Sequence, residues 1–190
     1  MKKTDLNKFQ NDWYNPGSKI KIGIWYWVNL LFFKNPWNPF SKLKVLLLRI
    51  FGAKIGKKVV IKPSVNIKYP WFLEVGDQVW IGEEVWIDNL AKVKIEANVC
   101  ISQGAMLLTG NHNYKKSSFD LMVGEIKLEE GVWIGAKAVV CPGVTCHSHS
   151  VLAVGSVATY DLESYTIYQG NPAKLIRSRI ISESLLENFL

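Results

Sequence analysis

Aliphatic residues return every six positions through the centre of the chain. The frame restarts twice after a shift of two residues and once after a long interruption. All of its members are apolar: Ile55, Ile61, Ile67, Val75, Ile81, Ile87, Ile95, Ile101, Leu107, Leu128, Ile134, Val140, Cys146, Leu152 and Ala158. A helix needs a period of 3.6 and a half-buried strand a period of 2, so neither explains the pattern alone. Short strands joined by tight turns do, with three units closing one triangular coil.

A second inward position follows each aliphatic residue by four, and it is small or β-branched: Val59, Val65, Val79, Val85, Val99, Ala105, Val132, Ala138, Val144, Ser150 and Ser156. Glycine often comes directly after the aliphatic residue, as at Gly135, and we expect it there for the backbone angles that a β-carbon opposes. The pattern predicts an all-β chain, a parallel β-helix of about five triangular coils stacked about 4.8 Å apart. A β-sandwich with a chance run of Val and Ile is the alternative.

The irregularities of the frame all follow the third unit of a coil. They lie at 68–71, 88–93 and 108–127. The three insertions therefore fall on one corner of the triangle, with the longest, a protruding loop, on the third coil. This places Asp88 and Asn89 one coil beneath the base of the loop that carries His112.

The repeat divides the chain into three parts. Residues 1–54 form an N-terminal aromatic and helical cap, residues 55–163 the β-helix, and residues 164–190 a C-terminal segment. We predict a helix from an N-cap at Ser41 to a stop at Gly52 and a short C-terminal helix with a capping box at Ser184 and Glu187. The cap would cover the open strand edges of the first coil. Shallow membrane contact through aromatic residues and lysines is a second interpretation of the same segment.

Composition narrows the class of protein. With 190 residues, 48% hydrophobic and 21% charged, the chain suits one globular domain. Its net charge of +7 favours anionic partners, but no nucleic-acid-binding motif accompanies it. Three cysteines without CxxC spacing and a start without an apolar signal run indicate a cytoplasmic protein. The apolar stretch 22–33 is shorter than the ~20 residues that span a bilayer.

Several segments carry a resemblance to a known family. The units "VGDQVWIGEEVWIDNLAK", the loop "TGNHNY", the return "WIGAKAVVCPGVT" and the ending "YQGNPAKLIR" resemble the hexapeptide-repeat acyltransferases, in particular the maltose and galactoside O-acetyltransferases. "KYPWFLEVGDQVWIGEEVWIDNL" and "NLLFFKNPWNPFSKLKVLLLRIFGAKIG" are most similar to acetyltransferases of colanic-acid and exopolysaccharide synthesis. The resemblance covers roughly residues 13–180 and implies a left-handed β-helix, an exception to the right-handed crossover rule.

The resemblance also implies an activity. Family members are homotrimers with active sites between subunits, and they transfer acetyl from acetyl-CoA directly to a sugar hydroxyl. By position, His112 matches the catalytic histidine and Asn89 the asparagine that holds the acceptor, with Asp88 as the alternative. Ala136, Val154 and Thr159 match coenzyme contacts. Lys174 and Arg177 match basic positions that meet its phosphates.

The chemistry of these residues fits acyl transfer. An alcohol needs a base before it can attack, and histidine is well matched to that task. Backbone N–H groups at Gly135–Ala136 could stabilise the oxyanion. Two departures from the family pattern stand out: Asn113 where an aspartate is common, and Tyr160 where a lysine is common.

Alternative functions remain open from the sequence. Some hexapeptide-repeat proteins are carbonic anhydrases with zinc on three histidines, and this chain has His112, His147 and His149, although the last two are too close in sequence to fit that pattern. An N-acetyltransferase acting on an amino sugar is another. Cys141 and Cys146 could be proposed as nucleophiles, but both occupy regular repeat positions typical of buried cysteine. We expect no metal, a free or lipid-linked glycan acceptor, and a cytoplasmic location that could be peripheral at the membrane.

Overall fold

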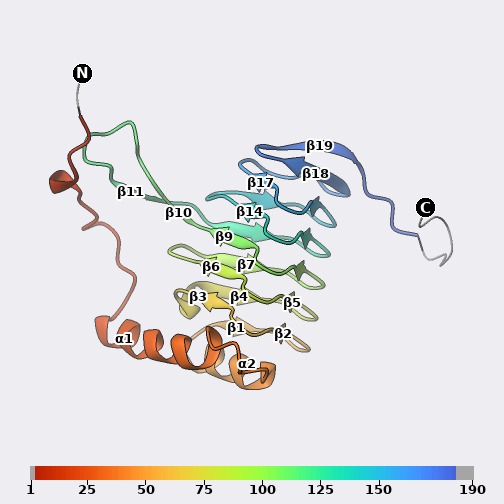
Figure 1. Ribbon diagram of the computed structural model, residues 1–190, viewed down its shortest axis with the longest axis horizontal. Helices are drawn as coiled ribbons and strands as arrows, with labels where there is room; N and C mark the ends of the chain where they lie inside the picture. Colours follow the sequence, from red (N-terminus) through yellow and green to blue (C-terminus); the bar gives the residue numbers. More distant parts are fainter. Residues whose placement is uncertain (1–2, 183–190) are drawn as a thin grey trace.

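The structure, a computed structural model, describes residues 3–182 and is a parallel β-helix of five complete coils and a partial sixth (Figure 1). The C-terminal helix predicted for 182–190 falls outside the described residues, apart from Ser182. Sheet A contains β1 (Lys54–Ile55), β4 (Leu73–Val75), β7 (Val93–Ile95), β12 (Ile126–Leu128) and β15 (Thr145–Cys146).

The other two sides of the prism are sheets B and C. Sheet B contains β2 (Val60–Ile61), β5 (Trp80–Ile81), β8 (Cys100–Ile101), β13 (Trp133–Ile134), β16 (Val151–Leu152), β18 (Thr166–Gly170) and the antiparallel β19 (Ala173–Ser178). Sheet C contains β3 (Asn66–Ile67), β6 (Trp86–Asp88), β9 (Met106–Leu108), β14 (Val139–Val140) and β17 (Val157–Ala158). Three sheets around one core confirm the architecture that the period of six predicts.

The aliphatic frame forms the core in the predicted register. Ile81 pairs with Ile61 below and Ile101 above, and the same column continues through Ile134 and Leu152. Every frame residue is buried except Ile55, which lies half-buried in the first coil. The sixth coil adds Leu162 and Tyr168, both buried. These two residues are again six positions apart. Because the second is the aromatic Tyr168, the aliphatic pattern does not predict this coil.

The glycines after the aliphatic residues have a different role from the one we expected. Gly135 is not in the left-handed region of φ. A Cβ there would lie 2.6 Å from the backbone nitrogen of Val154 in the next coil, so glycine permits close stacking. The left-handed residue of this turn is Lys137, with φ of 54°.

The three insertions leave the same corner of the prism, between sheets C and A, as predicted. The longest contains the hairpin of β10 (Gly110–His112) and β11 (Leu121–Val123), which projects from the third coil (Figure 1). Asp88 pairs with Leu108 at the foot of this hairpin, and its carbonyl accepts the Thr109 hydroxyl at 2.9 Å. Asp88 and His112 therefore share one edge.

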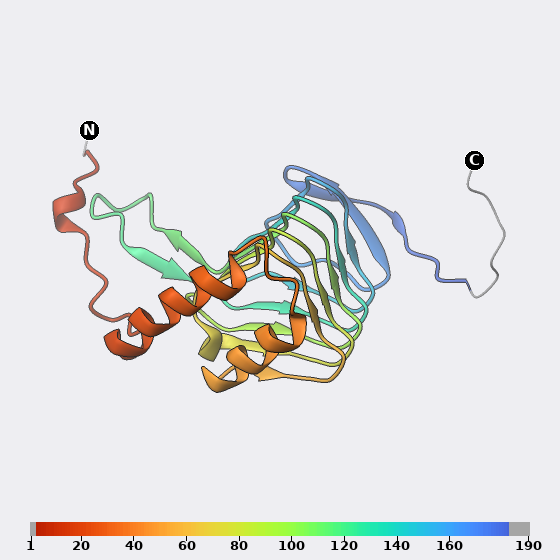
Figure 2. The same ribbon diagram turned by 60° about the horizontal axis from the view of Figure 1, so that its bottom comes forward.

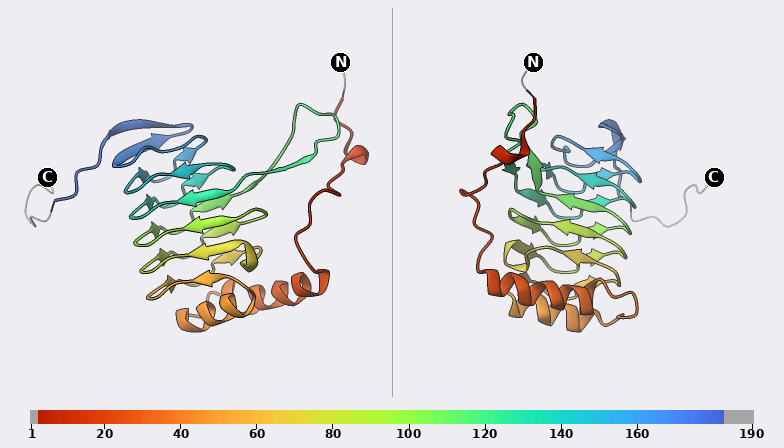
Figure 3. Two further views of the ribbon diagram at one scale, coloured as in Figure 1. Left: turned by 180° about the vertical axis from the view of Figure 1, so that it is seen from behind. Right: turned by 60° about the vertical axis from the view of Figure 1, so that its left-hand side comes forward.

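The N-terminal cap lies across the first coil (Figures 2 and 3). It contains α1 (Lys19–Val28), the π-helical turn Asn29–Phe33 and α2 (Ser41–Ile50). Its side chains donate to carbonyls that have no coil beneath them: Trp25 Nε1 to Ile67 at 2.8 Å, Lys44 Nζ to Lys62 at 2.7 Å and Arg49 Nη2 to Ile55 at 2.8 Å. The cap thus replaces a missing coil for the backbone, which supports the capping interpretation.

The prediction of Ser41 as N-cap was wrong. Ser41 is the first residue of α2, and the N-cap position belongs to Phe40. The Ser41 hydroxyl instead accepts the Ile61 N–H at 2.8 Å and donates to the Val59 carbonyl. It joins the helix to the first coil. Among residues 3–182, no helix has the length and apolar character needed to cross a membrane.

The outer faces of the three sheets differ in polarity. Sheet A carries charged side chains that pair between coils, such as Lys54 with Glu74 at 2.8 Å and Lys127 with Glu96 at 3.5 Å. Sheet B instead exposes Trp80 and Trp133, and sheet C exposes Trp86 and Met106. Sheet A therefore suits solvent, while sheets B and C are the apolar sides.

Burial of Lys44 predicts a pH dependence of stability. The Lys44 side chain is inaccessible to solvent, and burial lowers its pKa to about 8. Between pH 8 and its unfolded pKa of 10.5, the unfolded chain binds a proton that the folded chain has lost, so the free energy of unfolding rises with pH there. Relative to Lys44→Met, the wild type should gain about 3 kcal/mol across this window in urea titrations. A constant difference between the two proteins would contradict the assignment.

Candidate active site

His112 lies at the end of β10, and one nitrogen of its imidazole is hydrogen-bonded within the hairpin. Its Nδ1 is 3.0 Å from the Phe119 carbonyl oxygen, and the imidazole stacks on the Phe119 ring with centroids 4.5 Å apart and planes 8° apart. Because a carbonyl can only accept, Nδ1 carries the proton in the neutral ring. Among residues 3–182, Nε2 has no hydrogen-bond partner. Its lone pair is free to take a proton from an incoming group.

Asn113 does not orient the histidine. Its side-chain oxygen accepts the Lys115 N–H at 3.1 Å, and its own N–H donates to the Asp120 carbonyl. The Phe119 carbonyl supplies the orientation that an aspartate after the histidine would otherwise provide. This contact closes the hairpin on itself, so no sequence pattern signals it.

An N-terminal strap, residues 5–17, connects the hairpin to the cap along the same edge (Figure 1). At the hairpin, Asp5 N–H donates to the Ser117 carbonyl at 2.8 Å, and the Phe9 ring lies 5.8 Å from the imidazole of His112. Further down, Tyr14 Oη donates to the Leu90 carbonyl at 2.8 Å. No sequence pattern indicates the strap, since it has no periodicity and its contacts are distant in sequence.

Asn89 and Asp88, the two residues considered for acceptor binding, have different environments. Asn89 is fully buried, and both ends of its amide bond the backbone of Tyr69: Nδ2 donates to the carbonyl at 2.6 Å and Oδ1 accepts the N–H at 3.0 Å. Asp88 instead reaches a pocket, with Oδ1 3.0 Å from Lys68 Nζ. The Asn89 amide is thus committed to holding the turn that contains Tyr69.

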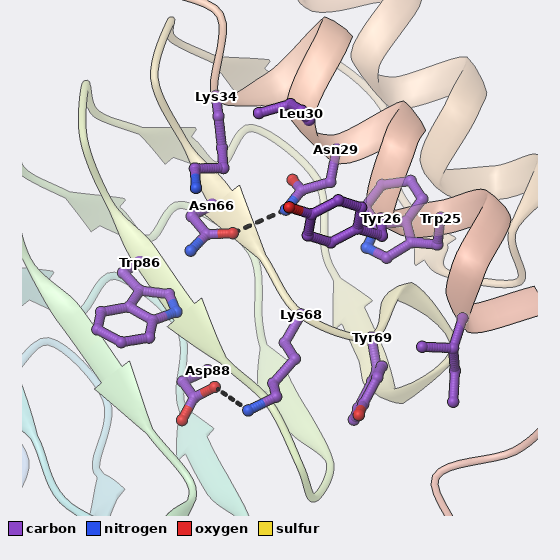
Figure 4. Close-up of a pocket in the computed structure, with 11 residues that line it drawn as sticks. Trp25, Tyr26, Asn29, Leu30, Lys34, Asn66, Lys68, Tyr69, Trp86 and Asp88 are labelled. Atoms are coloured by element: carbon purple, nitrogen blue, oxygen red, sulfur yellow. Dashed lines mark hydrogen bonds and ion pairs between the residues drawn. The ribbon is translucent and has the colours of Figure 1, made fainter. Parts of the chain in front are cut away.

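The pocket at Asp88 has aromatic sides and a polar floor (Figure 4). It has a volume of about 350 Å³ and lies between α1 and sheet C. Tyr26, Tyr69 and Trp86 contribute aromatic rings, and the Asn29 amide donates to Asn66 Oδ1 at 2.7 Å. Such a mixture of aromatic surface, amides and a carboxylate suits a small polar ring.

A second, larger hollow lies on sheet B. It has a volume of about 640 Å³ and includes four of the residues singled out from the sequence: Gly135, Ala136, Val154 and Arg177. Arg179 also lines it and donates from Nη1 to the carbonyls of Gly131 and His149, both at 3.0 Å. The lining of this groove thus includes two guanidinium groups, which can bind phosphates.

Thr159 and Lys174 do not line this groove. Both are exposed, Thr159 after β17 and Lys174 on β19 beside Gln169. Tyr160, where a lysine is common, donates its hydroxyl to the Ala173 carbonyl. It ties β19 to the fifth coil instead of presenting a charge.

The histidine hairpin and the groove lie on different edges of the same chain. The hairpin leaves between sheets C and A, whereas Gly135–Ala136 forms the turn between β13 and β14, from sheet B to sheet C. Figure 2 shows the hairpin projecting on one side and β18–β19 of sheet B on the other. His112 and the groove on sheet B are therefore separated in one chain.

In the described part of the chain, the side chains of His147, His149, Cys141 and Cys146 are held by packing and by an ion pair, and none is placed for catalysis or metal binding. His147 Nδ1 lies 3.3 Å from Glu129 Oε2, and a hydrogen bond from Lys127 holds the pKa of Glu129 down at about 2. His149 packs on Tyr165 at 4.7 Å between ring centroids. Within residues 3–182 no three His, Cys, Asp or Glu side chains are grouped as for a metal ion. Burial raises the pKa of both Cys141 and Cys146, which disfavours the thiolate that a nucleophile needs.

Comparison with known proteins tests the resemblance seen in the sequence. No model of a protein family matches the chain. Over 172 residues the chain is 37% identical to the Escherichia coli protein named "Putative colanic acid biosynthesis acetyltransferase WcaF", covering 90% of this chain and 93% of that protein. The chain belongs to the hexapeptide-repeat acetyltransferase family.

Other members of this family extend the likeness. The galactoside O-acetyltransferase of Escherichia coli is 28% identical over 134 residues, which cover 69% of this chain and 66% of that enzyme. A hexapeptide-repeat acetyltransferase of Vibrio cholerae, crystallised with acetyl-CoA, matches with a TM-score of 0.74 at 23% identity, covering 86% of this chain and 87% of the other. The 37% identity confirms the family that the repeat, loop and ending predict, and the Vibrio cholerae structure shows the same fold.

The Phe119 contact predicts the tautomer of His112. The neutral imidazole should carry its proton on Nδ1, because only then can it donate to the Phe119 carbonyl. Long-range ¹H–¹⁵N NMR spectra of histidine-labelled protein, recorded at alkaline pH where imidazole is neutral, would show this directly. His147→Gln and His149→Gln assign the other two rings. A proton on Nε2 would refute the orientation.

Proposed function

We propose that the protein transfers the acetyl group of acetyl-CoA to a hydroxyl of a sugar acceptor in exopolysaccharide synthesis, with His112 as general base. The observation that carries this is the imidazole itself: Nδ1 is bound to the Phe119 carbonyl, and Nε2 is left to accept the hydroxyl proton. The name of the Escherichia coli relative, with 37% identity over most of the chain, supports the class of pathway.

Acetyl-CoA would lie in the groove on sheet B. Gly135 N–H already donates to the Leu152 carbonyl at 2.7 Å, whereas Ala136 N–H has no partner among residues 3–182. Ala136 rather than Gly135 is thus the donor for the thioester oxygen, on which negative charge develops during attack. Val154 would line the path of the pantetheine arm, and Arg177 and Arg179 would face the phosphates, since all three residues line the groove. Thr159 and Lys174 lie outside the groove and would not contact the coenzyme there.

The complete site forms between copies of the chain. The hairpin of one copy supplies His112, and the groove of its neighbour supplies the donor, because the two lie on different edges of one chain. The apolar outer faces of sheets B and C, with Trp80, Trp133 and Trp86 exposed, support such an association. A homotrimer with cyclic symmetry would contain three equal sites.

The acceptor would bind near Asp88 rather than Asn89. The Asn89 amide is occupied by Tyr69, while the Asp88 carboxylate lines the aromatic pocket on the same edge as His112. Sugar hydroxyls donate well to carboxylates, and sugar rings pack on aromatic faces such as Trp86. The reaction would take place in the cytoplasm, with the protein peripheral at the membrane where lipid-linked glycans are found.

Replacing the base tests the proposed chemistry. His112→Ala should lower acetyl transfer at least a thousandfold, since no other group accepts the hydroxyl proton. Coenzyme A affinity, measured by calorimetry, should stay within about twofold because the groove is unchanged. Transfer is assayed with labelled acetyl-CoA against a panel of nucleotide sugars and lipid-linked glycans. Full activity of His112→Ala would reject the role.

Replacing Arg177 tests the position of the coenzyme. Arg177→Gln should weaken coenzyme A binding about tenfold, because it removes a charged donor to phosphate. Pantetheine, which lacks the phosphates, should bind both proteins equally. Lys174→Gln, on the same strand but outside the groove, is the matched control. A larger loss from Lys174→Gln than from Arg177→Gln would place the phosphates elsewhere.

A further inference from the structure

Positive charge is concentrated at the capped end of the β-helix. Residues 13–73, which include the cap and the first coil, contain no Asp or Glu, and the rest of the chain is net acidic. Eleven basic residues lie in this stretch: Lys19, Lys21, Lys34, Lys42, Lys44, Arg49, Lys54, Lys57, Lys58, Lys62 and Lys68. Charge of one sign gathered at one end attracts an extended anionic surface.

The same end exposes a row of large apolar side chains. Ile20, Ile24, Trp27 and Leu31 follow helical spacing along one face of α1 and the turn after it, opposite the buried Trp25. Trp37, in the connection to α2, is 89% exposed. Phe40, just before α2, and Leu46 and Ile50, on α2, are exposed as well. We call these eight residues the outer cap face; so many exposed apolar side chains on two neighbouring helices indicate an interaction site.

A groove beside α2 combines both characters. Its volume is about 670 Å³, and it lies between α2 and the first coil. Val45, Leu46 and Val59 supply apolar lining, while Lys42, Arg49, Lys57 and Lys58 supply charge. Apolar contact with basic groups beside it matches a lipid whose headgroup is a phosphate and whose chains are hydrocarbon.

We propose that the outer cap face docks on an anionic phospholipid bilayer, with Trp27, Leu31 and Trp37 inserted at the interface and the surrounding lysines on lipid phosphates. Tryptophan prefers the boundary between headgroups and acyl chains. Helices rich in lysine with an apolar face lie in the plane of this boundary. Here both α1 and α2 lie at the end of the stack of coils and run across its axis (Figure 3), so both can contact one flat surface.

Charge argues against a second copy as the partner of this face. Two outer cap faces meeting each other would bring like charges together without any acidic side chain of residues 13–73 to pair them. In the proposed trimer, a point that rests on the proposed function, parallel chains would place three caps at the same end and add their affinities. The β-helix would then stand on the bilayer with the His112 hairpin about two coils, roughly 10 Å, above the first coil.

Vesicle flotation tests the charge contribution. The intact protein should bind vesicles of phosphatidylglycerol and phosphatidylcholine, and should not bind phosphatidylcholine alone. Because each lysine near the surface contributes about fivefold, the triple variant Lys34→Gln, Lys42→Gln and Lys57→Gln should bind about a hundredfold more weakly. The matched control, Lys8→Gln, Lys115→Gln and Lys137→Gln, removes the same charge away from the cap and should bind like the wild type. Equal losses in both would overturn the proposal.

Quenching by brominated lipid tests the insertion. Trp27→Ser and Trp37→Ser should each lower the fraction of tryptophan fluorescence quenched on anionic vesicles, whereas Trp133→Phe, on sheet B, should not. Light scattering on the same variants distinguishes a protein contact. A change of oligomeric state in Trp27→Ser, with no vesicle binding by the wild type, would show that another copy covers this face and would overturn the proposal.

The membrane proposal and the proposed reaction fail separately. His112→Ala leaves the cap intact, so it should float with anionic vesicles as the wild type does. Acetyl transfer without binding to these vesicles would refute the membrane docking but not the proposed reaction. Binding to the vesicles without any acetyl transfer would refute the proposed reaction but not the docking.

Discussion

The parallel hydrogen-bond ladder between successive coils is the constraint on which the rest of the structure depends. Each coil can bond the next only if equivalent residues lie directly above one another, as Ile61, Ile81 and Ile101 do. Any extra residue must then leave at a corner, where it does not break the ladder. The hairpin with His112 and the turn with Asp88 share an edge for this reason. The first coil has no coil below it, and side chains of the cap donate hydrogen bonds to its backbone carbonyls instead.

The same constraint explains what could be predicted from the sequence. A period of six registers every strand against its neighbours, so the sheets, the core and the shared corner of the insertions followed from the pattern alone. The position of Gly135, Ala136, Val154 and Arg177 beside one groove followed from the family resemblance. The sheets, the core and the shared corner depend on the repeat, and the repeat can be read directly from the sequence.

Other features depend on contacts that no repeat encodes. The amide of Asn89 looks like a binding group in the sequence, but it bonds the backbone of Tyr69. The strap reaches His112 through Phe9, about a hundred residues away in the chain. Ser41 has the composition of an N-cap, yet its hydroxyl bonds the first coil. In each case a polar or aromatic group found a partner through tertiary packing, which local patterns do not specify.

Assembly of the site between copies is the central claim, and mixed trimers test it most directly. His112→Ala removes the base from the hairpin of its own chain. Ala136→Trp fills the groove of its own chain, which serves the hairpin of a neighbour. Each variant alone should be inactive. When they are co-expressed in equal amounts, a site is intact only where an Ala136→Trp chain gives the hairpin and a His112→Ala chain gives the groove. This happens at about a quarter of the interfaces, so about a quarter of wild-type acetyl transfer should return. Mixed trimers without activity would show that each chain contains its own complete site and would contradict the account.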